Sequence, residues 1–125
     1  MSDGPAIDLS LNEVETIAAK AARGAGLSWG GAEEIGKAAR VMATAGAHWD
    51  DLLVDLLPAV ATGAMPAVEF ALLDRFASVQ GGARTRFAIA PLRLAALEAL
   101  GARTYVAATA RSREAGAGAG LTDND

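Results

Sequence analysis

The chain has 125 residues, of which 52% are hydrophobic but only 5% aromatic, so its length and composition fit one domain with a helix-rich core of small side chains. Its net charge of -4 opposes binding to nucleic-acid phosphates, and the absence of cysteine excludes disulfides, thiolate nucleophiles and thiolate metal sites. No stretch reaches the roughly 20 apolar residues that a membrane span needs, so we expect a cytoplasmic protein that binds neither membrane nor nucleic acid.

The first helix is marked by its capping residues. Residues 1–8 are expected to form a loose lead-in, after which Ser10 and Glu13 have the spacing of a capping box. In that motif the serine oxygen accepts a hydrogen bond from the backbone N–H three residues on, and the glutamate accepts one from the N–H of the cap residue. The apolar periodicity continues until Gly24 or Gly26, where we expect the helix to end.

A second helix is predicted from Ser28, its cap, to about Ala45. Glu33 and Lys37 are spaced as an i,i+4 ion pair on its polar side. The helix also carries a row of small residues that lets another backbone come close: Ala32, Gly36, Ala39 and Ala43. Because the turn before it is short and rich in glycine, we expect the first two helices to form an antiparallel hairpin.

The third helix is expected to begin near Trp49, with acidic residues in its first turn and leucines on its buried side. Pro58 lacks a backbone donor and clashes with the preceding turn, so we expect the helix to end or kink there. Residues 62–66 are expected to form a break. A fourth helix then starts with Pro66 in its first position and stops at residues 80–82.

The next part of the chain predicts a strand, a helix and a second strand. Residues 85–89 alternate between polar and apolar, residues 91–100 are helical up to Gly101, and residues 104–107 are strand-like again. We expect the strands to form a parallel pair packed on the helices, because so small a sheet is not stable alone. The expected fold class is α+β, predominantly α-helical, with four to five helices and a small two-stranded element near the C-terminus.

Residues 111–125 form a glycine-rich acidic tail after a single domain of residues 9–110. Alternating glycine and alanine bury little apolar area, which favours disorder. Two features favour a role instead: Leu121 can anchor the tail in a groove, and Asp123 and Asp125 offer the oxygen ligands that Mg²⁺ or Ca²⁺ prefers. A third alternative is a tail that becomes ordered only against a partner.

Arginines precede this tail. Arg103, Arg111 and Arg113 can hold a carboxylate or a phosphate, although a solvated basic patch is the commoner explanation of such residues. The tail glycines lack the Lys-Ser/Thr pair of a phosphate-binding loop. The sequence identifies no cofactor, and the candidate ligand-binding residues are Arg103, Ser112, Arg113, Gly118, Asp123 and Asp125.

His48 is the single histidine, so a site with two histidine ligands is excluded. It can act as a general base if Asp50 or Asp51 orients it, but helix capping or partial exposure is the commoner role. No set of nucleophile, base and orienting group is recognisable, so we assign no catalytic and no metal-ligating residue. The candidate interface residues are Trp29, Gly36, Trp49 and Leu121.

Both ends of the chain carry short motifs. Within residues 9–40 they are SLNE, KAARGAG and WGGAEE. Within residues 102–125 they are RTYV, SR and GAGAG, followed by an acidic C-terminal end. In these motifs the chain resembles a family of small, uncharacterised proteobacterial proteins of unknown function, whereas residues 46–84 do not align. The resemblance implies no activity. It does imply that GAGAGLTDND belongs to a family pattern, which weakens its interpretation as a tail without a role.

The preferred hypothesis is a non-catalytic accessory or partner-binding protein that acts through helical surfaces and its tail, as a homo-oligomer or with another subunit. Its inventory of reactive side chains is too small for most reaction classes. The alternative is a small enzyme or catalytic subunit that binds an anionic metabolite through the three arginines, with the tail aspartates as base or metal ligands. A helix-turn-helix regulator is disfavoured, because Glu33 and Glu34 would meet the phosphates.

Overall fold

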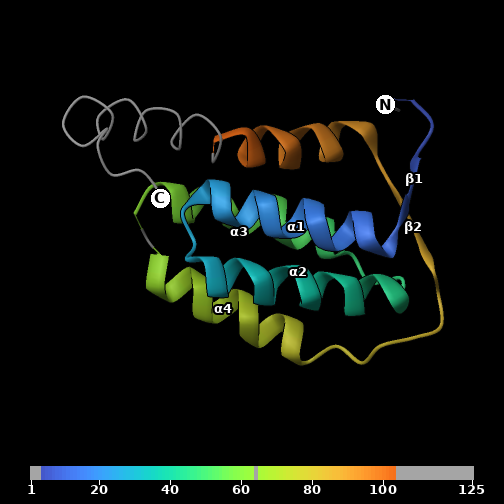
Figure 1. Ribbon diagram of the computed structural model, residues 1–125, viewed down its shortest axis with the longest axis horizontal. Coiled ribbons are helices and arrows are strands. Elements are labelled where there is room, and N and C mark those ends of the chain that lie inside the picture. The colour runs from blue at the N-terminus through green and yellow to red at the C-terminus, as the bar shows by residue number, and fades with distance from the viewer. Residues whose placement is uncertain (1–3, 64, 104–125) are drawn as a thin grey trace, which may run out of the picture.

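The structure, a computed structural model, describes residues 4–63 and 65–103. The elements, in chain order, are β1 (Ile7–Ser10), α1 (Leu11–Ala25), α2 (Trp29–Thr44), α3 (Trp49–Ala61), α4 (Met65–Ala77) and β2 (Arg86–Ile89). A further helix, here called the C-terminal helix, covers residues 91–103. The helices lie alongside one another and the two strands lie together at one end of them (Figure 1). The predicted fold class, α+β and mostly helical, is therefore confirmed.

Both predicted helix caps are confirmed. The Ser10 hydroxyl accepts a hydrogen bond from the Glu13 N–H at 3.1 Å, and the Glu13 carboxylate accepts one from the Ser10 N–H at 2.8 Å. Gly26 ends α1 with φ at 119°, a left-handed conformation that glycine adopts without a steric penalty. The Ser28 hydroxyl accepts from the Gly31 N–H at 3.0 Å. As a result α2 starts where the sequence predicted it.

The row of small residues on α2 faces α1. Gly36 is buried, and a Cβ atom placed on it would lie 2.8 Å from the Glu15 carbonyl oxygen of α1. Ala32, Ala39 and Ala43 on the same helix are buried as well. The predicted close approach of another backbone is therefore confirmed, and the backbone in question belongs to the first helix of the same hairpin.

Ion pairs on α2 differ in part from the prediction. Lys37 Nζ lies 4.0 Å from the Glu34 carboxylate, its i−3 neighbour, whereas we expected the pair with Glu33. Both spacings bring side chains together on a helix surface, so periodicity alone does not choose between them. Arg40 instead links the two helices, since its Nη1 lies 3.2 Å from the Glu15 carboxylate of α1.

Pro58 lies within α3, which continues to Ala61, so of the two expected outcomes, an end or a kink, the end of the helix at this residue is wrong. Pro58 is exposed, and its missing N–H leaves a single carbonyl of the preceding turn without its helical donor. The residues on the opposite side, Leu53, Leu57 and Val60, are buried. We attribute the continuation of the helix to this burial, which offsets the loss of one backbone hydrogen bond.

The sheet departs most from the prediction. β1 pairs with β2 in antiparallel orientation, with Leu9 opposite Phe87, so residues 1–8 are not wholly a lead-in. Leu9, Phe87 and Ile89 are buried, which shows that the pair presents an apolar face to the helices. The strand expected at residues 104–107 lies outside the described residues. The two-stranded element thus joins the start of the chain to its C-terminal half rather than lying near the C-terminus.

The C-terminal helix packs directly on α1. A Cβ atom on Gly24 would lie 1.8 Å from the Leu100 carbonyl oxygen, and one on Gly101 would lie 3.3 Å from the Lys20 Cβ. Gly101 is itself helical, so the expectation that it ends this helix is wrong; the helix runs through residue 103. The glycines at 24 and 101 therefore act as contact points between two helices.

Candidate functional site

Arg103 is the predicted ligand-binding residue that the structure describes. The others, together with Arg111, lie outside the described residues: Ser112, Arg113, Gly118, Asp123 and Asp125. Arg103 is exposed in the last described turn of the C-terminal helix. It borders a groove of about 350 Å³ lined by Val54, Pro58, Ala96, Ala99, Leu100 and Arg103. Apart from Arg103, the side chains that line this groove are apolar.

Trp29, a predicted interface residue, is accessible, with 65% of its surface exposed. The Arg23 guanidinium carbon lies 4.6 Å from the centroid of the Trp29 ring, which is the geometry of a cation–π contact. Arg23 Nη1 also donates a hydrogen bond to the Leu27 carbonyl at 2.8 Å. Because the guanidinium contacts both the indole and the Leu27 carbonyl, it holds the exposed indole in one orientation.

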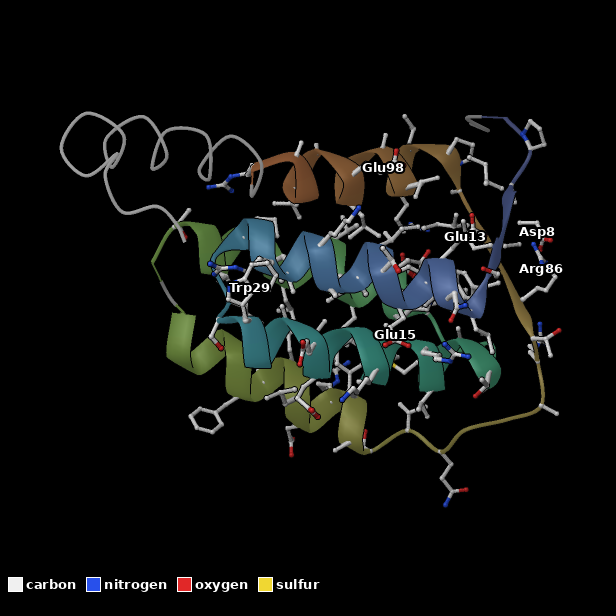
Figure 2. All side chains as sticks on the ribbon, in the orientation of Figure 1. Asp8, Glu13, Glu15, Trp29, Arg86 and Glu98 are labelled. Carbon is white, nitrogen blue, oxygen red and sulfur yellow. The ribbon has the colours of Figure 1, made fainter. Side chains whose placement is uncertain are left out.

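Trp29 and Arg103 lie at the same end of the molecule. Figure 2 shows Trp29 at the end of the helices that the last described turn of the C-terminal helix reaches. The packing of Gly101 against Lys20 places the last turn of the C-terminal helix beside α1 there. We define the basic end face as Lys20, Arg23, Trp29 and Arg103. It brings three cations to one end of a chain whose net charge is -4, and the acidic residues Glu15 and Glu33 line the same hollow as Lys20.

The other predicted interface residues are differently placed. Trp49 is fully buried, and its ring centroid lies 5.4 Å from that of Phe87. Gly36 is buried against α1. Packing within the chain accounts for both residues, and neither is exposed to a partner. Leu121 lies outside the described residues.

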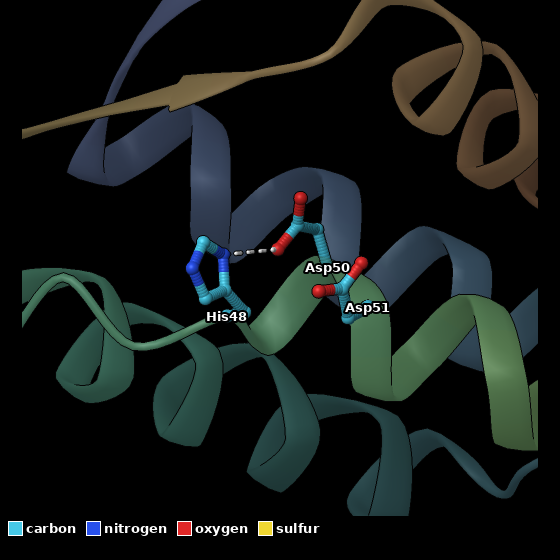
Figure 3. Close-up of side chains that lie close together, drawn as sticks. All are labelled: His48, Asp50 and Asp51. Atoms are coloured by element: carbon cyan, nitrogen blue, oxygen red, sulfur yellow. Dashed lines mark ion pairs between the residues drawn. The ribbon is translucent and has the colours of Figure 1, made fainter.

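A second group of polar side chains lies at the start of α3, here called the His48 cluster and made of His48, Asp50, Asp51 and Arg93. His48 directly precedes the helix, the aspartates are in its first turn, and Arg93 comes from the C-terminal helix. His48 Nδ1 lies 3.8 Å from Asp50 Oδ1 (Figure 3). Arg93 Nε lies 2.8 Å from Asp51 Oδ1, and its Nη1 lies 3.6 Å from Asp50 Oδ2. The histidine and aspartates singled out in the sequence are thus close in space.

Asp50 is buried, with 2% of its surface exposed, and its Oδ1 has no hydrogen-bond partner among the described residues. Burial raises the pKa of Asp50 above its ordinary value; the Asp51 backbone N–H opposes this shift, the Asp51 charge adds to it and Arg93 opposes it. The His48 side chain, by contrast, is 70% exposed. The cluster therefore places a desolvated carboxylate oxygen beside an accessible imidazole.

Arg93 is a member of the cluster that was not among the residues predicted from the sequence. This residue lies on a helix that is remote in sequence from His48, and the local pattern around it does not identify which acidic residues it contacts. Its pairing with Asp50 and Asp51 arises when the C-terminal helix packs beside the start of α3. The available signal was weak: a cation in the first turn of a helix, where acidic residues are favoured, suggests an external partner.

A family model matches the N-terminal part of the chain. The model of a family described as "Protein of unknown function (DUF3726)" matches residues 9–56. This match confirms that the chain is similar to an uncharacterised family over its N-terminal part; the proteobacterial grouping stays a prediction. No curated protein and no solved structure matches. Within residues 4–63 and 65–103, no helix is both long and apolar enough to cross a membrane.

Proposed function

We propose that this protein is a non-catalytic partner-binding protein whose basic end face docks onto a second copy of the chain or onto another subunit. The observation that carries the proposal is the exposed indole of Trp29 beneath the anchored guanidinium of Arg23. Tryptophan and arginine are enriched among the residues that dominate interface energies. Because both side chains are already ordered, binding would cost little further side-chain entropy.

The charge of the basic end face and the groove beside Arg103 indicate which side chains the partner would present. Lys20, Arg23 and Arg103 favour carboxylates around the contact and would speed its formation at low ionic strength. The groove beside Arg103 has apolar side chains and suits an aliphatic or aromatic anchor. We therefore expect the partner to present an apolar side chain surrounded by acidic residues.

The C-terminal tail is part of the same proposal. Arg103 belongs to the basic end face, and the sequence continues from it towards GAGAGLTDND. Leu121 is an apolar residue within that acidic end and can supply a further contact with the partner. The proposed interaction therefore uses helical residues and the tail together.

The test compares two exposed aromatic residues. Trp29→Ala removes the indole of the basic end face, whereas Phe70→Ala removes a side chain of similar class on α4 that is 76% exposed. Self-association is measured by sedimentation across concentrations, and any subunit that co-purifies from the native host is identified and its affinity measured. We expect Trp29→Ala to weaken the complex by about tenfold or more, and Phe70→Ala to leave it unchanged.

Two results would overturn the proposal. One is a protein that sediments as a monomer at every concentration and co-purifies with nothing from its native host. The other is a complex that both variants weaken to the same extent, because that outcome would place the contact away from the basic end face.

A further inference from the structure

We propose that His48, Asp50 and Asp51 form a binding site for a divalent transition-metal ion, with Zn²⁺ as the best-matched ion. Each of these residues offers one ligand atom, and the three atoms lie within 4.8 Å of one another. Figure 3 shows the imidazole and the two carboxylates gathered at the start of α3. This site lies apart from the basic end face, so the inference does not depend on the proposed function.

The buried oxygen of Asp50 is the second observation that points to a ligand. Asp50 Oδ1 is directed at His48 Nδ1 from 3.8 Å, and it has no hydrogen-bond partner among the described residues. A buried charged oxygen without a partner is costly, and such oxygens in proteins are normally satisfied by a donor or an ion. A cation held between the imidazole and this carboxylate would meet that requirement.

The distances fit a small ion after minor adjustment. Zn²⁺ binds imidazole nitrogen and carboxylate oxygen at about 2.0–2.2 Å, so two tetrahedral ligands lie about 3.3–3.6 Å apart. The 3.8 Å between His48 Nδ1 and Asp50 Oδ1 exceeds this range only slightly, whereas the three ligand atoms together lie within 4.8 Å, so the Asp51 side chain must also turn towards the ion. Asp50 is held by its burial, while the exposed side chain of His48 can rotate towards it. Little reorganisation of the backbone is therefore needed.

Arg93 orients the two carboxylates of the proposed site, but its charge weakens the binding of a cation there. It contacts Asp51 through Oδ1 and Asp50 through Oδ2, which leaves the second oxygen of each carboxylate for an ion. A group that holds the far oxygen of a ligating carboxylate orients that ligand. Its positive charge also repels a cation, so we expect weaker binding than at a structural zinc site with four protein ligands.

The donor set indicates the class of ion. One imidazole nitrogen with two carboxylate oxygens suits Zn²⁺, Ni²⁺ or Cu²⁺, whereas Mg²⁺ and Ca²⁺ prefer sites made of oxygen alone. The described part of the chain thus holds a mixed nitrogen and oxygen site. It differs from the predicted oxygen ligands Asp123 and Asp125 of the C-terminal tail, which offer no nitrogen.

The single histidine makes a direct experiment practicable. The full-length protein is titrated with Zn²⁺ at neutral pH, and the imidazole proton resonances of His48 are followed by NMR. We expect these resonances to shift or broaden with saturation, and calorimetry to give the same affinity. A parallel titration with Mg²⁺ should leave them unchanged.

Three full-length variants locate the ion. His48→Gln changes an exposed side chain, so it should fold normally and bind Zn²⁺ at least about tenfold more weakly. Asp50→Asn should weaken binding similarly, and circular dichroism shows whether this buried change leaves the fold intact. The control with Asp123→Asn and Asp125→Asn together should bind like the wild type. Unchanged affinity in His48→Gln, or no saturable shift of the imidazole in the wild type, would overturn the proposal.

Discussion

At the scale of single residues, Gly24 shows how a missing side chain positions a whole helix. It lies inside α1, where a Cβ atom would come within 1.8 Å of the Leu100 carbonyl oxygen and 2.6 Å of its carbon. A backbone group cannot rotate out of the way as a side chain can. The hydrogen at this position therefore allows the C-terminal helix to reach α1 and to bring Arg103 to the basic end face.

This contact predicts opposite effects at two helical glycines. Gly24→Ala should lower the free energy of unfolding by about 1–3 kcal/mol or more, because the C-terminal helix must move. Gly30→Ala is the control, since a Cβ atom there meets nothing within 4 Å and alanine is the better helix former by up to about 1 kcal/mol. Urea unfolding of both variants measures the difference. Equal stability in the two would show that the close contact with Leu100 does not matter.

At the scale of elements, the start of α1 depends on a charged cap. The hydrogen bond from the Ser10 backbone N–H, together with that involving its hydroxyl, lowers the pKa of Glu13 below its ordinary value. A carboxyl whose pKa is lower in the folded state contributes stability above its unfolded-state pKa. That contribution is lost as the pH falls through the folded-state pKa. The stabilisation that the Glu13 cap provides should therefore be lost in acid, at pH values below the ordinary pKa of a glutamate.

The variant Glu13→Gln separates charge from geometry in this cap. Glutamine can still accept the hydrogen bond from the Ser10 N–H, but it does not titrate. We expect the stability advantage of the wild type over the variant to shrink as the pH is lowered from about 7 to about 3. Urea unfolding at a series of pH values measures this difference in the free energy of unfolding. A difference that stays constant over this range would contradict the role assigned to the ionised carboxylate.

At the scale of the whole molecule, Phe87 joins three distant parts of the chain. It lies on β2 opposite Leu9 of β1, and its ring is 5.4 Å from that of Trp49 at the start of α3. It also meets the His48 ring edge-on at 6.3 Å. The strand pair is thus anchored to the same helix start that carries the His48 cluster.

Removing this ring should therefore affect the entire fold. Phe87→Ala is expected to lower the free energy of unfolding by about 3–5 kcal/mol, the usual cost of deleting a buried phenylalanine. Phe70→Ala, at an exposed position, should change it by no more than about 0.5 kcal/mol. Denaturant unfolding followed by circular dichroism compares them. Similar losses in the two variants would show that β2 contributes little to the core.

The sequence by itself determined the local elements. Ser10 and Ser28 mark two helix starts, and the alternation in residues 85–89 marks β2, because each signal depends on hydrogen bonds or side-chain spacing within a few residues. The proximity of His48 to Asp50 could also be predicted from the sequence, since both residues lie at the start of one helix. These features do not depend on how distant segments pack.

Only the tertiary structure decided which surfaces meet. The pairing of β1 with β2, the role of Gly24 and the approach of Arg93 to Asp51 each join residues that are far apart in sequence. Continuation of α3 through Pro58 likewise follows from burial of the helix's other side. Such outcomes depend on the total area buried and on charges that become neighbours after folding, and local periodicity carries no information about either.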